Sequence, residues 1–317
     1  MDGDAFDVLV LGAGLRGLVA ALRVQREQPG ARLLVVDVLP QPGGSIRTQR
    51  SNGFLCELGP FGFARHEISP VLECLHQPPP LVAALASAHK GSLFTGKELQ
   101  PIPVDPMPVS FRTGNEELVQ ACRRELGPTL RLGRAATAIE PAPHGFVVTL
   151  GGEVPTPVVA RRLVLALPDP VAGSLLLRFD PALADTAGRV RTEPHAFAFF
   201  GGTASEAPEL RGYGVVPADD LDTPLAEAIF CAQVFPDRAL PGRFLVRCEA
   251  NGALVGGNDT DVLAVVAAEL QRWTGLRAHL GFTKLHRFSV EVADGSLVEC
   301  RVRLRGLATR VPGLTIF

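Results

Sequence analysis

The stretch that decides the fold is residues 7–37, DVLVLGAGLRGLVAALRVQREQPGARLLVVD. It opens with a short apolar strand over residues 7–11 and passes through a glycine turn into a helical pattern of apolar residues. Pro29 and Gly30 stop that helix, and a second apolar run over residues 33–36 ends at Asp37. This order of strand, turn, helix and strand predicts a βαβ unit, whose natural place is a parallel sheet.

The glycine turn has the spacing of a phosphate-binding loop, and it reads Gly12, Ala13, Gly14, Leu15, Arg16, Gly17. The first glycine permits a tight turn, the second lets a pyrophosphate approach the backbone, and the third lets the helix pack on the strand. Asp37 ends the next strand, where a carboxylate would hold a ribose hydroxyl. The unit therefore predicts dinucleotide binding, with a purely structural glycine turn in another α/β fold as the alternative.

Composition limits the function classes. The 317 residues suggest about two domains, and 46% hydrophobic residues suffice for sizeable cores. The net charge of -2 provides no basic stripe, so nucleic acid is not expected as a partner. Acidic residues precede the first apolar run, and no run approaches the ~18 apolar residues of a membrane span, so we expect cytoplasmic residence. Peripheral membrane contact stays open.

Cysteine and histidine residues are dispersed. The six cysteines form no CxxC pair, and the seven histidines form no HxxxH or HExxH motif. Buried reduced thiols and the absence of a metal site are therefore expected. The cysteines are Cys56, Cys74, Cys122, Cys231, Cys248 and Cys300.

In the rest of the chain, some segments are expected to join the domain of the βαβ unit, and others to form a second sheet inserted into that domain. We expect a hairpin over residues 92–103, a helix over 115–126, and strands over 130–141, 146–150 and 162–167. Successive strands over residues 195–250, including 229–235, predict an antiparallel sheet, and residues 261–274 predict a helix. In that helix Trp273 is expected to be a core residue. His286 is expected to be structural.

Three arginines near the end alternate with apolar residues. Arg301, Arg303 and Arg305 predict one solvated face of a strand, with an anion-binding patch as the alternative.

Several motifs after the βαβ unit resemble, in order, those of the flavin-dependent amine oxidase superfamily. Residues 42–47, PGGSIR, resemble its second glycine loop, although in isolation they would read as a surface turn with a solvated arginine. Residues 57–60, ELGP, residues 131–141, RLGRAATAIEP, and residues 162–168, RLVLALP, are similar to segments that follow that loop. Residues 212–217, GYGVVP, and 229–236, IFCAQVFP, resemble elements of the protoporphyrinogen oxidase branch.

The resemblance implies FAD as the cofactor and a set of residues that line it. These are Gly12, Ala13, Gly14, Leu15, Arg16, Gly17, Asp37, Val38, Gly43, Gly44, Ser45, Ile46, Arg47, Leu58, Gly59, Pro60, Ala136 and Ala166. Where the family has an arginine for a substrate carboxylate, this chain has Gly91 with Lys90 beside it, so Lys90 is the implied substrate contact. Because the cofactor carries the chemistry, no catalytic residue is implied.

The chain departs from this family in two places. Only residues 104–110 stand where the family carries a helical domain that supplies much of the substrate pocket. Residues 312–317, PGLTIF, end where the family continues into a turn and helix that contact the flavin. We therefore expect an open flavin site and weakened turnover, because hydride transfer needs reacting atoms at about 3–3.5 Å.

The resulting expectation is an α/β fold: a Rossmann-type, glutathione-reductase-like FAD domain with an inserted antiparallel sheet domain. The expected boundaries are 1–64, 111–188 and 276–317 for the FAD domain, 65–110 for a shortened substrate segment, and 189–275 for the antiparallel domain. The implied function is oxidation of a porphyrinogen-like substrate by oxygen in porphyrin biosynthesis. The alternatives are a non-catalytic ligand-binding or interaction module, as a homodimer or with a completing partner chain, and an incomplete gene product.

Overall fold

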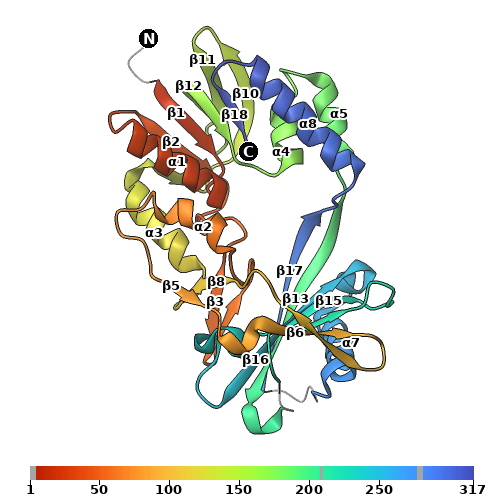
Figure 1. Cartoon of the computed structure of the whole chain (residues 1–317). Coiled ribbons are helices and arrows are strands. Elements are labelled where there is room, and N and C mark those ends of the chain that lie inside the picture. Colours follow the sequence, from red (N-terminus) through yellow and green to blue (C-terminus); the bar gives the residue numbers. More distant parts are fainter. Residues whose placement is uncertain (1–4, 208–209, 277–280) are drawn as a thin grey trace.

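The computed structural model describes residues 5–207, 210–276 and 281–317. In this part the chain forms two lobes, each built on a seven-stranded sheet (Figure 1). The first sheet has the order β10-β11-β12-β1-β2-β9, with β18 also paired to β12. Its strands are β1 Phe6–Leu11, β2 Leu33–Asp37, β9 Leu130–Leu132, β10 Ala136–Ala142, β11 Gly145–Leu150, β12 Thr156–Leu165 and β18 Leu314–Ile316. We call the lobe around it the first lobe.

The sheet of the first lobe is covered on both faces, and it is parallel except for the antiparallel pairs β10–β11 and β11–β12. Strand β1 pairs in parallel with β2 and with β12, and its residues 8–11 are buried because helices lie on either side. One face packs on α1 Leu15–Glu27, α2 Arg65–Leu72 and α3 Glu116–Leu126, and the other on α4 Asp169–Leu175, α5 Pro181–Gly188 and α8 Gly295–Arg310. The predicted βαβ unit and the α/β fold class are confirmed.

Helix α8 corrects the expectation of a strand for the three late arginines. Four buried residues with helical spacing, Leu297, Cys300, Leu304 and Leu307, face the core of the first lobe. The period-2 alternation of arginine and apolar residues covers only residues 300–305 and lies within this longer helical period. Arg301 pairs with Asp169 at 2.6 Å and Arg303 pairs with Asp180 at 3.2 Å.

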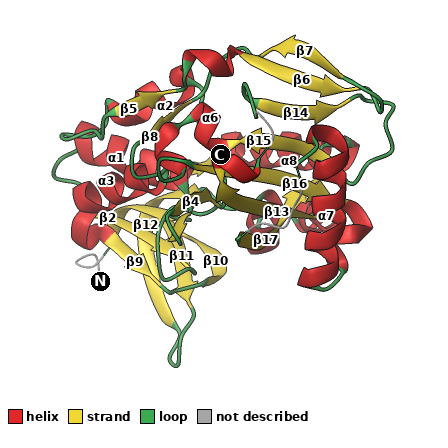
Figure 2. Cartoon of the chain, turned by 90° about the horizontal axis from the view of Figure 1, so that it is seen from below, coloured by secondary structure: helices red, strands yellow, loops and turns green. Residues whose placement is uncertain are grey.

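The second sheet has the order β17-β13-β16-β15-β14-β6-β7, and Figure 2 shows these strands one after another with α7 at their side. Its strands are β6 Lys90–Phe94, β7 Leu99–Pro103, β13 Thr192–Thr203, β14 Gly214–Pro217, β15 Leu225–Phe230, β16 Arg243–Asn251 and β17 Phe282–Glu291. The pair β6 and β14 is parallel and the others are antiparallel, so the sheet is mixed. Helix α7, Asp259–Thr274, packs on it through the buried Trp273, which confirms that residue as core. This is the second lobe.

The lobes divide the sequence differently from the expected boundaries. Residues 65–110 form no unit of their own, because α2 packs into the first lobe while β6 and β7 belong to the second sheet. Strand β17 also belongs to the second sheet, so the chain returns to the first lobe at α8. Within 229–235, the short helix α6, Cys231–Val234, replaces part of the expected strand.

A buried ion pair lies where the lobes meet. Arg238, at the end of the 3-10 turn Pro236–Arg238, has a side chain 1% exposed and lies 3.2 Å from the equally buried Glu57 carboxylate. Glu57 ends β4, Phe54–Glu57, which pairs with β3, Thr48–Ser51. Burial raises the pKa of Glu57 and lowers the pKa of Arg238. Hydrogen bonds from Thr48 Oγ1 at 2.8 Å and from the Asn115 N–H at 3.0 Å offset that cost at Glu57.

Candidate dinucleotide site

The turn after β1 has a geometry that only glycine satisfies at two positions. Gly12 has φ of 100°, and a Cβ on it would lie 2.3 Å from the carbonyl oxygen of Ala166. A Cβ on Gly17 would lie 1.8 Å from the carbonyl oxygen of Gly12. The N–H of Gly12 donates to the carbonyl of Val36 at 2.8 Å, which binds the turn to β2. The sequence spacing therefore corresponds to a close approach of strand, turn and helix.

Asp37 lies at the carboxyl end of β2, directly beside this turn. Its Oδ2 accepts the backbone N–H of Ala13 at 2.6 Å, and its Oδ1 accepts the N–H of Leu39 at 2.8 Å. These two bonds fix the carboxylate at the edge of the sheet where ligands of open α/β folds bind.

The second glycine loop packs against the first, backbone to backbone. The Gly43 N–H donates to the Ala13 carbonyl at 2.7 Å, and Gly14 and Gly43 form a parallel bridge. A Cβ on Gly44 would lie 3.2 Å from the Cα of Gly14. Arg47 braces the same loop by donating to the carbonyls of Pro42 at 2.5 Å and Gln41 at 3.1 Å. Its guanidinium therefore holds the loop together in this structure.

Residues 58–60 join the second loop to the second lobe. The Leu58 N–H donates to the Arg47 carbonyl at 2.8 Å, and a Cβ on Gly59 would lie 2.0 Å from the carbonyl oxygen of Ser45. The Gly59 carbonyl in turn accepts from Arg247 Nη1 of β16 at 2.8 Å.

Arg247 and its partners were not predicted. Its side chain is 5% exposed, pairs with Glu227 at 2.9 Å, and lies 4.2 Å from the ring centre of Phe197 and 5.3 Å from that of Phe61. Burial raises the pKa of Glu227. The sequence shows only a single arginine within an apolar strand. It does not show where the side chain of that arginine points or which residue it contacts.

A cavity of about 210 Å³ lies at the carboxyl ends of β1 and β2. It brings together four of the predicted residues, Gly12, Asp37, Val38 and Ala136. Its other walls are mainly apolar: Leu11, Val36, Ala135, Leu167, Val171 and Leu175, with Arg134 the one other charged residue. A carboxylate beside bare turn backbone and apolar walls suits an adenosine group.

A second cavity of about 120 Å³ adjoins the first turn of α1. Arg16 of the predicted set lines it together with Arg301 and Arg305 of α8 and with Asp169. Two of the three late arginines therefore do meet at a cavity, although Arg303 is directed to Asp180.

Lys90 lies in the other lobe. It is exposed at the start of β6, its carbonyl accepts the Tyr213 N–H at 2.9 Å, and it does not line the cavity beside Asp37. His286, on β17, is half-buried and its ring stacks on Phe288 at 6.3 Å between centroids. Burial lowers the pKa of His286. The contacts of His286 are those of a packed side chain in the second sheet, as expected for a structural histidine.

Comparisons with known proteins agree with this geometry. A family model described as an NAD(P)-binding Rossmann-like domain matches residues 10–77. Chloroplastic protoporphyrinogen oxidase 1 of Arabidopsis thaliana is 30% identical over 144 residues, covering 44% of this chain and 25% of that protein. Coproporphyrinogen III oxidase of Staphylococcus aureus is 34% identical over 53 residues, 17% of this chain and 11% of that protein. The chain thus matches a quarter or less of the length of these relatives.

The similarity to solved structures extends over the whole chain, whereas the similarity in sequence covers less than half of it. A protein provisionally named protoporphyrinogen oxidase from Exiguobacterium superposes with a TM-score of 0.81 at 15% identity, covering 100% of this chain and 94% of that one. Cyclohexylamine oxidase from Brevibacterium oxydans gives a TM-score of 0.76 at 12% identity, covering 98% and 92%. The fold is therefore that of the flavin amine oxidase-like proteins: a Rossmann-like dinucleotide-binding lobe with a second, mixed sheet. Within the described residues, every helix is too short or too polar to cross a bilayer.

Proposed function

We propose that this protein is an FAD-dependent oxidoreductase. The observation that carries the proposal is the cavity of about 210 Å³ in which the Asp37 carboxylate, the Gly12 turn and apolar walls meet. Asp37 can exchange its bond from the Ala13 N–H for one from a ribose hydroxyl, while Val38 and Ala136 would contact the adenine. A carboxylate at this position disfavours a ribose 2′-phosphate, so the proposal favours FAD over a phosphorylated nicotinamide cofactor.

The other predicted residues fit the rest of the same cofactor. Gly14 and Gly44 expose backbone without side chains where the two loops meet, which suits a pyrophosphate next to the start of α1. Residues 58–60 lead from there towards the second lobe. When bound, FAD would accept a hydride or electrons from the substrate, and the chain's own residues would bind, orient and exclude water.

The proposed substrate is a porphyrinogen-like compound, with oxygen as the final acceptor. The support is the similarity to protoporphyrinogen oxidase 1 and the aromatic side chains Phe61, Phe197 and Tyr213, which gather beside Gly59. Aromatic rings of this kind can pack against the separate pyrrole rings of a porphyrinogen. Lys90 is retained as the proposed contact for a substrate carboxylate.

The test is the visible absorption spectrum of the full chain after incubation with excess FAD and desalting. Flavin bands that are lost in Gly14→Asp, but kept in the matched variant Gly30→Asp, would support the proposal, because Gly30 has no atom within 4 Å of an added Cβ. Bleaching of those bands on anaerobic addition of protoporphyrinogen would support the substrate class, and bleaching only by an aliphatic amine would replace it.

A spectrum with protein absorbance alone would reject the oxidoreductase proposal. The chain would then be a non-catalytic relative, working as a homodimer or completed by a partner chain. Light scattering of the purified protein distinguishes those two assemblies, and fractionation of the producing cells tests the proposed cytoplasmic residence.

A further inference from the structure

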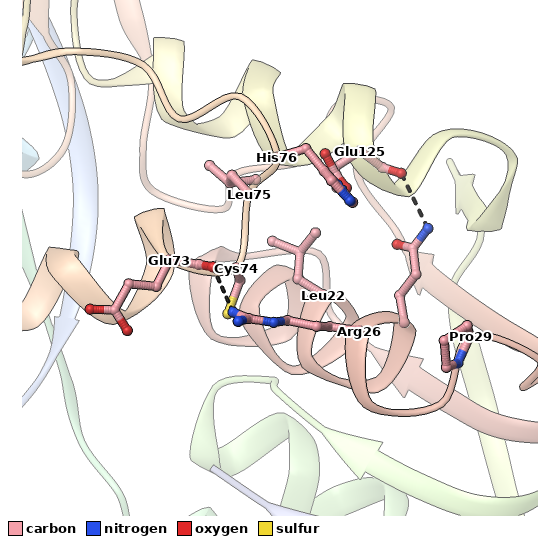
Figure 3. A pocket seen from close by; sticks show the side chains of 9 residues that line it. Leu22, Arg26, Pro29, Glu73, Cys74, Leu75, His76 and Glu125 are labelled. Atoms are coloured by element: carbon pink, nitrogen blue, oxygen red, sulfur yellow. Dashed lines mark hydrogen bonds and ion pairs between the residues drawn. The ribbon is translucent and has the colours of Figure 1, made fainter.

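A cavity of about 610 Å³ lies where three helices of the first lobe end, and no predicted site residue lines it (Figure 3). Helix α1 ends at Glu27, α2 at Leu72 and α3 at Leu126, and residues from all three ends line the cavity. Because helix carboxyl ends present free carbonyls and about half a negative charge each, this arrangement favours a cation.

Side chains add to this negative character. Glu73 and Glu125 line the cavity, and the contact of His76 Nδ1 occupies one oxygen of the Glu125 carboxylate. Arg26 is the one lining arginine, and it already donates to the Glu73 carbonyl at 2.7 Å beyond the end of α2. Arg26 thus binds a backbone carbonyl, and Figure 3 shows the Glu73 carboxylate directed away from Glu125, so Glu125 supplies the carboxylate that faces the other lining side chains.

The side-chain oxygen of Gln25 is a hydrogen-bond acceptor to which no group in the described part of the chain donates. Its Nε2 donates to the carbonyl oxygen of Glu125 at 3.4 Å, which fixes the amide nitrogen on that side. Its Oε1 is buried and has no hydrogen-bond partner in the described part of the chain. Reversing the amide would set two oxygens against each other, so the missing partner is an external N–H or O–H group.

The remaining walls are apolar. Leu22 lies between His76 and Glu125 on one side and Arg26 on the other, and Leu75 lies beside His76 (Figure 3). A ligand that fits both features carries a charged donor on a short hydrocarbon body. In residues 5–207, 210–276 and 281–317 no group of three His, Cys, Asp or Glu side chains is arranged to hold a metal ion, so the donor set points to an organic cation.

We propose that this cavity binds a small alkylammonium ion, whose N–H groups reach Gln25 Oε1 and the Glu125 carboxylate while its alkyl part contacts Leu22 and Leu75. The site is separate from the dinucleotide cavity, so the proposal does not depend on FAD.

Isothermal titration of the full chain with n-pentylammonium chloride tests the proposal, with 1-pentanol as the neutral analogue of equal size. Wild-type protein is expected to bind the ammonium ion and to bind the alcohol much more weakly. Glu125→Gln and Gln25→Leu should each weaken binding about tenfold, the order expected when a hydrogen bond to a charged group is lost. Glu67→Gln and Gln120→Leu, matched changes on the neighbouring α2 and α3 outside the cavity, should leave binding unchanged.

Absence of binding to the wild type would overturn the proposal. So would equal affinity for 1-pentanol, which would show an apolar hole only, or undiminished binding by both cavity variants. Thermal unfolding verifies that each variant folds. If Gln25→Leu does not fold, Gln25→Met and Glu125→Gln decide the outcome.

Discussion

Ala13 donates its backbone N–H to Oδ2 of Asp37 across 2.6 Å, so the acid that ends β2 is bound directly to the glycine turn that follows β1. The carboxylate is therefore held in place before any nucleotide arrives, with an N–H already at the distance of a charge-assisted bond. A nucleotide bound at this position would replace a hydrogen bond that Asp37 already makes, and it would not have to order the Asp37 side chain first.

Asp37→Asn should weaken ADP binding about tenfold, because a hydrogen bond to a charged group is replaced by a neutral one. Titration calorimetry with ADP measures the change. Asp219→Asn, a substitution in an exposed turn of the second lobe, is the control. An unchanged ADP affinity in Asp37→Asn would show that Asp37 does not contact the nucleotide.

Gly12→Ala should lower the free energy of unfolding by about 3 kcal/mol or more, through its left-handed φ and the contact with Ala166. Urea unfolding monitored by circular dichroism gives the value. Gly30→Ala has open space around its Cβ and should change stability by about 0.5 kcal/mol or less. Similar values for the two variants would contradict the close packing of the turn.

The βαβ unit and its turn could be predicted because they are local: residues 7–37 contain both the strands and the glycines that join them. The distribution of residues 65–110 between two lobes could not. Their hairpin was predictable from spacing, but the partner of each element lies far along the chain, as in the pairing of β6 with β14. Hydrophobic periodicity and residue propensity predict which segments form helices and strands. Tertiary contacts decide which sheet each strand joins.

The same limit applies to the candidate site. Asp37 was recognisable because a motif of fixed length places it. Arg247, which contacts the Gly59 carbonyl from 188 residues away, belongs to no motif. Glu57 was noticed only as part of the ELGP segment, and its partner Arg238 was not predicted at all.

Glu57→Gln should cost about 3–5 kcal/mol of stability, because it leaves the buried Arg238 without a charged partner. The double variant Glu57→Gln with Arg238→Met should recover part of that loss. Chemical denaturation of both variants measures the difference. Additive losses in the double variant would show that the two side chains act independently.

Thiol reactivity should distinguish one cysteine. Burial raises the pKa of Cys56, Cys122 and Cys231 to about 12, whereas Cys74 is partly exposed. Native protein at pH 8 should therefore react quickly with one equivalent of Ellman's reagent, and unfolded protein with six. Cys74→Ser should abolish the rapid phase. A rapid phase that persists in Cys74→Ser would show that a second thiol is accessible.

Asp294 caps α8 and should make stability depend on acid pH. Hydrogen bonds from Ser296 and then from Arg191 lower the pKa of Asp294. A lowered pKa stabilises the fold above the ordinary value of about 4 and loses that effect as pH falls. The melting temperature of Asp294→Asn should therefore lie below that of the wild type at pH 7, with a difference that shrinks below pH of about 4. A constant difference across this range would contradict the charge-based explanation.

One edge of β12 is shared between two strands from distant parts of the chain. Residues 156–160 pair with β11 close by in the sequence, while residues 163–165 pair with β18 at residues 314–316. During synthesis the second half of this edge has no partner until the whole second lobe has been made. The nascent chain therefore carries an unpaired stretch of strand, the kind of edge that invites pairing with another molecule. Protection by chaperones would matter most in that interval, which ends once residues 314–316 pair with β12.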